Sequence, residues 1–101
     1  MNTDIQKLAT EAAQGYVDAQ FELACFHDST RNHSEAVKWY RKAAEQNYAD
    51  AQFKLARCYD MGKGVRKDDV EAAKWYRKAA EQGHGDAQVA FASWRRNTRM
   101  S

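Results

Sequence analysis

The sequence predicts an all-α protein of about six short antiparallel helices, and three observations support this class. First, the stretch WYRKAAEQ at 39–46 recurs 36 residues later at 75–82. Second, alanine, glutamine, glutamate, lysine, arginine and leucine dominate the chain, and these residues lose little side-chain freedom in a helix. Third, the 101 residues include no proline, and valine, isoleucine and threonine are sparse. A turn-rich β sandwich therefore has little support.

The repeat divides the chain into an opening helix, two repeats and a closing helix. We expect the opening helix over 3–15, a first repeat over 16–47, a second repeat over 48–83, and a closing helix with a basic tail over 84–101. Each repeat is predicted to hold two helices. The first helix begins near an Asp-Ala-Gln motif and the second carries a Trp-Tyr pair.

In the second repeat we expect one helix over 49–60 and another over 69–82. Ala51, Leu55 and Tyr59 lie at helical spacing and form one apolar stripe in the first of these. The closing helix corresponds to that first helix, and we expect it to run from about Asp86 to Arg96, with Arg99 in a frayed basic tail.

The residues at the helix ends agree with this division. Gly15, Asn47 and Gly83 follow the opening helix and the second helix of each repeat. Glycine and asparagine tolerate the left-handed backbone that ends many helices. Asp68 lies three residues before Glu71, which predicts a capping pair at the start of the second helix.

The first repeat lacks four residues that correspond to 62–65, a Gly-Lys-Gly-Val segment. We therefore expect residues 29–33 to make a tighter turn without glycine. Asn32 precedes Glu35 by three residues, as in the second repeat, and this spacing predicts the same cap.

These residues resemble the Sel-1-like repeat, a relative of the tetratricopeptide repeat. Here the pattern is Ala51, Leu55, Tyr59, Gly62-x-Gly64-Val65, Asp68, Ala72, Trp75-Tyr76, Lys78 to Gly83, and Ala87-Gln88. The resemblance implies a short right-handed α-solenoid that serves as a non-catalytic adaptor, holding other proteins in complexes. Some secreted relatives carry a disulfide within each repeat, but Cys25 and Cys58 do not occupy equivalent positions.

The resemblance also implies where a protein partner binds, because in related solenoids the first helix of every repeat lines the concave surface. We expect an apolar row beside a mixed polar row on that face. We call these two rows together the predicted row, which consists of Phe21, Cys25, Asp28, Phe53, Arg57, Asp60, Val89, Ser93 and Arg96. Such a groove suits a helix or an extended peptide. The alternative is that Phe21 and Phe53 only pack between adjacent helices.

The closing helix offers a second candidate surface. Phe91 and Trp94 would form an exposed terminal patch, which would favour a partner or a homodimer. The alternative is that both aromatic rings turn inward onto Trp75 and Tyr76.

Two narrower functions remain open. The small size suits an inhibitor or immunity protein that blocks a toxin or an enzyme. Weak nucleic-acid binding would use the basic clusters Lys38-Arg41-Lys42 and Lys74-Arg77-Lys78. Glutamates in the same helices balance these clusters, and a net charge of +2 is low for a nucleic-acid binder.

Other function classes find no support in the sequence. No nucleophile with a separate base and orienting acid is visible, so we expect no enzyme activity and no cofactor. The three histidines and two cysteines do not show metal-site spacing. No apolar run approaches the ~20 residues that span a bilayer. Because the N-terminus does not resemble a secretory signal, we expect a cytoplasmic protein with reduced thiols.

Overall fold

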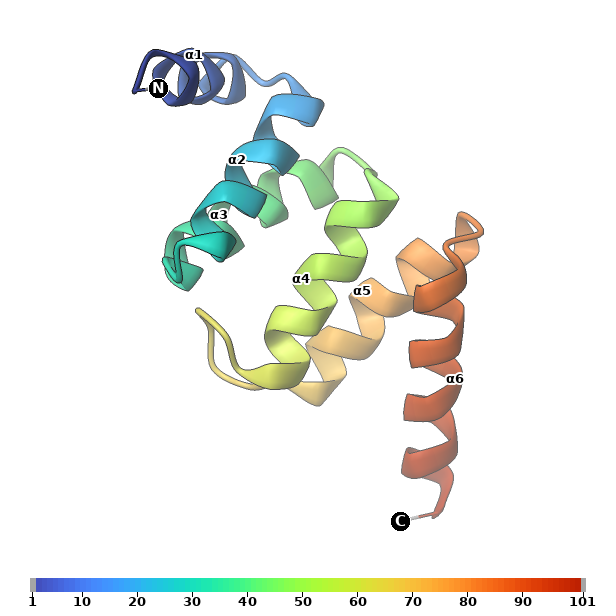
Figure 1. Cartoon of the computed structure of the whole chain (residues 1–101). Coiled ribbons are helices and arrows are strands. Elements are labelled where there is room, and N and C mark those ends of the chain that lie inside the picture. The colour runs from blue at the N-terminus through green and yellow to red at the C-terminus, as the bar shows by residue number, and fades with distance from the viewer. Residues whose placement is uncertain (1, 101) are drawn as a thin grey trace.

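The computed structural model describes residues 2–100, with side chains for 4–97. Over this range the chain forms six helices and no strand, as predicted. They are α1 (Asn2–Ala13), α2 (Val17–Ser29), α3 (His33–Glu45), α4 (Ala49–Met61), α5 (Asp69–Glu81) and α6 (Gly85–Met100). Each packs extensively only against the helices before and after it. The result is an elongated array of 50 × 25 × 17 Å with its termini at opposite ends (Figure 1). None of the described helices is long and apolar enough to cross a membrane.

We call α2, α4 and α6 the A helices and α1, α3 and α5 the B helices. The first repeat pairs α2 with α3, and the second pairs α4 with α5. The closing helix α6 is longer than expected, because it continues past Arg96 to Met100. The backbone of the predicted frayed tail is therefore helical, while the side chain of Arg99 lies outside the described residues.

Alanines form most of the core. Ala24, Ala36, Ala43, Ala51 and Ala56 are each completely buried. A methyl side chain lets two helix backbones approach closely, and it loses no rotamer freedom on burial. The repeated alanines of the sequence are therefore the positions at which successive helices touch.

A glutamine ladder connects the B helices to the A helices. The glutamine of each Asp-Ala-Gln motif donates a hydrogen bond back to a carbonyl at the end of the preceding B helix. These bonds join Gln20 to Ala12 at 3.2 Å, Gln52 to Ala44 at 3.2 Å and Gln88 to Ala80 at 3.1 Å. Each satisfies a carbonyl near a helix end, where intrahelical partners run out. The motif is thus explained by packing between helices.

The predicted helix ends are confirmed at four of five positions. Gly15, Asn47 and Gly83 have φ of 99°, 70° and 88°. The carboxylate of Asp68 accepts hydrogen bonds at 3.1 Å from two amides of the first turn of α5, so Asp68 caps this helix as predicted. The reciprocal bond of the predicted pair is not formed, because the amide of Asp68 donates to the carbonyl of Tyr59 rather than to Glu71.

The predicted cap at Asn32 is wrong, because its side chain makes no capping hydrogen bond. The short turn forces Arg31 to a φ of 65°, and the amide of Asn32 donates to the carbonyl of His27 at 2.8 Å. Backbone bonds that end α2 therefore fix Asn32 at ψ 70°, away from the extended backbone that a capping residue adopts.

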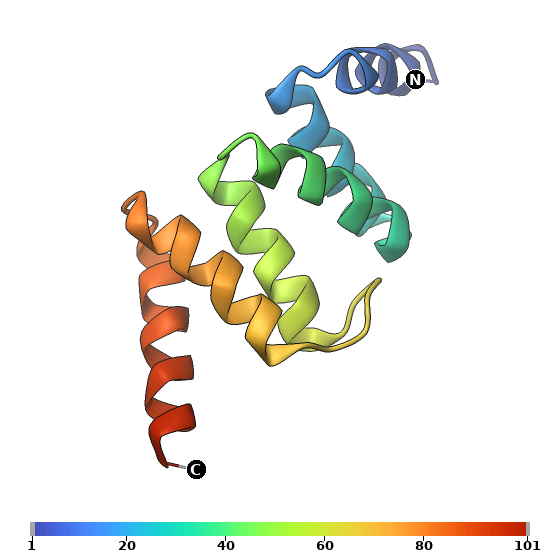
Figure 2. The ribbon, with the colours of Figure 1, turned by 180° about the vertical axis from the view of Figure 1, so that it is seen from behind.

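The loop between α4 and α5 crosses to the preceding repeat. Gly62 ends α4 with φ 68°, and Gly64 follows with φ 75°. A Cβ at Gly64 would overlap the backbone of His33 at the first turn of α3. Figure 2 shows the tip of this loop reaching toward that turn. The loop that the first repeat lacks is therefore a contact between repeats.

Candidate functional site

The predicted row divides into a packed half and an exposed half. Phe21 lies 5.1 Å from Tyr48, and Phe53 lies 4.7 Å from His84, between ring centroids. Both phenylalanines are half-buried against the core. They pack between adjacent helices, which was the alternative interpretation of these two residues.

Two polar members of the row also pack inward. The hydroxyl of Tyr40 lies 3.3 Å from a carboxylate oxygen of Asp28 and 3.7 Å from the sulfur of Cys25. The Nδ1 atom of His33 lies 2.9 Å from the other carboxylate oxygen of Asp28. Burial, with these neighbours, raises the pKa of Tyr40 well above its usual value.

The other five members are exposed. Arg57, Asp60, Val89, Ser93 and Arg96 all lie on α4 and α6, and Val89 is 69% exposed. Phe53, the counterpart of Val89 in α4, contacts rings from α5 and the turn after it. Val89 lacks such cover within the described residues, as its exposure shows.

Two clefts lie between consecutive A helices. The first junction, between α2 and α4, holds about 100 Å³ and is lined by Asp28, Lys54, Arg57, Cys58, Met61 and Lys63. The second junction, between α4 and α6, holds about 490 Å³. Its lining residues are Asp60, Lys67, Asp69, Ala72, Tyr76, Ala90, Ser93, Trp94 and Asn97. The larger volume lies within the range of ligand pockets.

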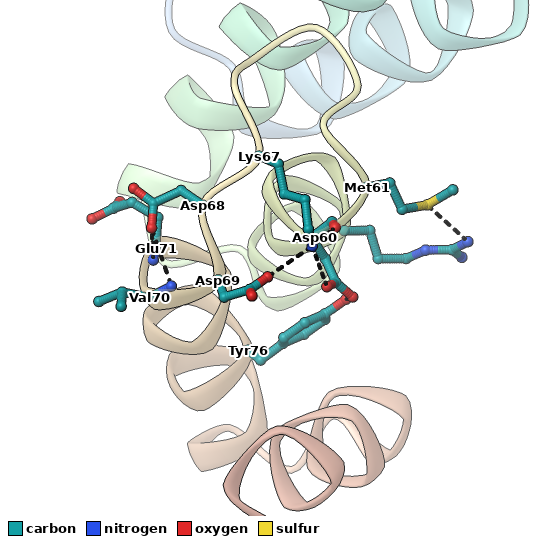
Figure 3. A network of polar contacts seen from close by, with 9 residues as sticks. Asp60, Met61, Lys67, Asp68, Asp69, Val70, Glu71 and Tyr76 are labelled. Atoms are coloured by element: carbon teal, nitrogen blue, oxygen red, sulfur yellow. Dashed lines mark hydrogen bonds and ion pairs between the residues drawn. The ribbon is translucent and has the colours of Figure 1, made fainter. Parts of the chain in front are cut away.

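A polar network forms one wall of the second junction (Figure 3). The ammonium of Lys67 donates to the carboxylate of Asp69 at 2.9 Å and to the carbonyl of Asp60 at 2.8 Å. The hydroxyl of Tyr76 lies 3.3 Å from the Asp60 carboxylate. Two carboxylates share one cation, so this wall carries excess negative charge.

Two pKa shifts follow from this network. Burial raises the pKa of the Tyr76 phenol, and the charge of the Asp60 carboxylate raises it further. The hydrogen bond to Asp69 raises the pKa of Lys67. At neutral pH Tyr76 is therefore a neutral donor and Lys67 a full cation. The wall can hold a polar or positively charged group but presents no activated nucleophile.

Most of this cleft was not predicted, because Lys67, Asp69, Tyr76, Ala90 and Asn97 were absent from the predicted row. A signal was nevertheless present in the aligned repeats. Lys54 and Arg57 of α4 correspond to the much smaller Ala90 and Ser93 of α6.

The predicted terminal patch is partly covered. Phe91 and Trp94 stack on each other at 6.0 Å between ring centroids. Phe91 is half-buried and packs against the core cluster that contains Trp75 and Tyr76. Both residues also line a cleft of about 230 Å³ between α5 and α6. The geometry therefore combines the two alternatives.

The cations of both basic clusters have partners. Lys38, Lys74 and Arg77 pair with glutamates of their own helices at 3.2 to 3.4 Å. The others contact aromatic rings: Arg41 meets Tyr59, Lys42 meets Trp39 and Lys78 meets Trp75. This pairing argues against a surface that attracts nucleic acid.

The two cysteines differ in burial, because Cys58 is buried and Cys25 is half-buried. Cys25 and Cys58 are free thiols. Burial raises the pKa of Cys58 to about 11, so it is protonated at neutral pH. Among the described residues, no three histidine, cysteine or acidic side chains are placed to hold a metal ion.

Several solved structures are similar to this chain in fold and in sequence. A protective antigen present in uropathogenic Escherichia coli strains, described as displaying an SLR fold, is 41% identical with a TM-score of 0.83. The match covers 88% of this chain and 20% of that one. A Sel1 repeat protein from Oxalobacter formigenes is 43% identical with a TM-score of 0.80, covering 85% and 37%. Cysteine rich protein B of Helicobacter pylori is 26% identical with a TM-score of 0.79, covering 85% and 68%.

The chain thus spans about a fifth and about a third of the first two relatives. No curated protein sequence matches it. The family model for the Sel1 repeat matches residues 17–48 and 49–84. These two segments correspond to the α2–α3 and α4–α5 pairs, each with the turn that follows. The two matches cover most of the chain, which therefore belongs to the Sel1 repeat family.

Proposed function

We propose that this protein is a non-catalytic interaction module that binds a protein partner on the A-helix surface at the second junction. The observation that carries the proposal is the division of the predicted row. Four of its residues are occupied by internal packing, whereas the exposed five lie on α4 and α6. Two of those five, Asp60 and Ser93, line the 490 Å³ cleft.

Membership of the Sel1 repeat family supports the general function, since such repeats are generally protein-interaction scaffolds. The cleft supports the location. It combines an aromatic surface from Tyr76 and Trp94 with charged groups from Asp60 and Lys67. Aromatic surface with a few placed polar groups is typical of protein binding sites.

The test is affinity capture from the native host with the immobilised full chain. Ser93→Arg places in the cleft the side chain that α4 carries at the equivalent position. Gln14→Arg adds the same charge at an exposed position at the far end of the array, and serves as the matched control. We expect one protein to be captured by the wild type and by Gln14→Arg, and lost with Ser93→Arg.

The captured protein is then purified, and its binding to the chain is measured by titration calorimetry. Equal affinity for wild type and Ser93→Arg would reject the second junction as the binding site. If the partner is an enzyme or toxin, its activity with equimolar chain distinguishes an inhibitor from an adaptor.

A further inference from the structure

The two junctions are built from equivalent positions of the repeat. When the repeats are aligned with one another, each residue up to Met61 that lines the first junction has a counterpart that lines the second junction. The pairs are Asp28 with Asp60, Lys54 with Ala90, Arg57 with Ser93, Cys58 with Trp94, and Met61 with Asn97. The aspartate accepts from a tyrosine of the B helix at 3.3 Å in both. The molecule therefore contains a closed and an open version of one site.

The closed version shows what fills this site. At the first junction the loop at 62–65 reaches toward the first turn of α3 (Figure 2). Gly64, with φ 75°, lies against the backbone of His33 so closely that no other residue fits. Val65 packs against the core, and Lys63 lines the cleft beside Asp28. A glycine turn that carries a lysine thus lies beside the aspartate.

Nothing equivalent covers the second junction within the described residues. The helix α4 ends at Met61, but α6 remains helical past the counterpart Asn97. Ala90 and Ser93 also leave the space that Lys54 and Arg57 fill. The first turn of α5, the counterpart of the covered turn of α3, holds Val70 at 71% exposure.

The charge of the open site favours the same kind of occupant. Among the described residues that line the cleft, Lys67 is the one cation, against the carboxylates of Asp60 and Asp69. A second cation would balance this wall. At the closed site Lys54, Arg57 and Lys63 line the cleft together with the single carboxylate of Asp28, which pairs with His33.

We propose that the second junction binds a short basic turn of a protein partner. A glycine with left-handed backbone would lie against the first turn of α5, and a lysine or arginine would face Asp60. This inference rests on the proposed function and specifies the chemistry of the partner segment.

A peptide copied from the loop between α4 and α5 can serve as the probe. The amide of Asp68 donates to the carbonyl of Tyr59 at 3.0 Å, so the ends of the loop between them lie close together. A head-to-tail cyclic peptide with the sequence of residues 60–67, Asp-Met-Gly-Lys-Gly-Val-Arg-Lys, therefore holds the turn. We expect calorimetry at low salt to give a Kd of about 0.1 to 1 mM with the full chain. Binding should weaken as salt is raised.

Variants on both sides make the test specific. Asp60→Asn should weaken binding about tenfold, because the turn's cation loses a charged partner. The double change Ala90→Lys with Ser93→Arg rebuilds the closed junction and should abolish binding, while Gln14→Arg leaves it unchanged. A cyclic peptide carrying Gly64→Ala should bind at least about tenfold more weakly. Circular dichroism checks that each protein variant remains helical.

Three outcomes would overturn the inference. One is no binding of the cyclic peptide at millimolar concentration. Another is binding that the double change leaves intact. The third is a dimer of the chain, seen by sedimentation, that the double change dissolves, since a second copy would then be the occupant. If the peptide fails but Ser93→Arg still abolishes capture of the host partner, the proposed function stands and only the basic turn is rejected.

Discussion

The first and second junctions share a backbone plan, but one is closed and the other open. At the first, Lys54, Arg57 and a glycine loop reduce the cleft to about 100 Å³. At the second, Ala90 and Ser93 leave about 490 Å³ beside an equivalent aspartate–tyrosine pair. Equivalent positions of two repeats can therefore have different roles, one in packing and one at an exposed cleft. The aspartate is half-buried at the first junction, where the loop lies beside it, and exposed at the second junction, where no described loop does.

The closed junction should be broken most strongly at Gly64. In Gly64→Ala the new Cβ would overlap the backbone of His33, and the alanine would have to adopt the left-handed backbone of Gly64. The loop must therefore move away from α3. We expect unfolding in urea to show a loss of about 3 kcal/mol. Gly15→Ala is the control, since its φ is 99° but nothing lies within 4 Å, and it should lose only about 1 kcal/mol. Equal losses would show that the loop contact contributes nothing.

The two tyrosines should differ next. Tyr40→Phe removes a buried donor from Asp28 and should lower the free energy of unfolding by about 1.5 kcal/mol. Tyr76→Phe removes the same bond at the open junction, where Asp60 keeps Lys67 and can reach water, and should lower it by about 0.5 kcal/mol. Parallel urea titrations measure both values. A larger loss for Tyr76→Phe would contradict the assignment of open and closed.

The thiol at the closed junction should make stability depend on alkaline pH. The pKa of Cys58 rises from 9.0 to about 11 on folding, because burial disfavours the thiolate. Between these values the folded state holds a proton that the unfolded state has lost, so stability falls as pH rises from 9 to 11. The urea midpoint should decline less steeply in Cys58→Ala than in the wild type. Identical slopes would mean that the thiol is not buried. Trp94, its counterpart, has no such group.

The smallest effect on stability is expected at the open junction. Lysine and arginine at positions 90 and 93 should change the free energy of unfolding by less than about 0.5 kcal/mol, because Ser93 is exposed and the half-buried Ala90 borders the open cleft, into which a lysine side chain can extend. Thermal unfolding of the double variant checks this value. A loss of several kcal/mol would show that the cleft does not accommodate the two longer side chains.

The helices could be predicted because local chemistry decides their ends. Gly15, Asn47 and Gly83 adopt the left-handed backbone that their residue types allow. Asn32 was mispredicted because its conformation depends on the bonds that end α2, one turn earlier. A capping motif is informative only where the preceding loop leaves its backbone free.

The site was harder to predict because its state depends on residues distant in sequence. Phe53 lies at a position suited to a groove, but its ring is packed by His84, which lies beyond the next helix. The open cleft depends equally on the path of a loop. The pattern of a single helix indicates neither fact. Alignment of the repeats does show that Ala90 and Ser93 stand where α4 has Lys54 and Arg57.

The contrast between the junctions can be measured directly by titrating the ¹⁵N-labelled full chain with the cyclic loop peptide. We expect amide shift changes at Asp60, Asp69, Ala90 and Ser93, and none at the equivalent positions of the first junction. Shift changes at Asp28, His33 and Lys54 of similar size, or at those residues alone, would contradict the claim that only the second junction is open.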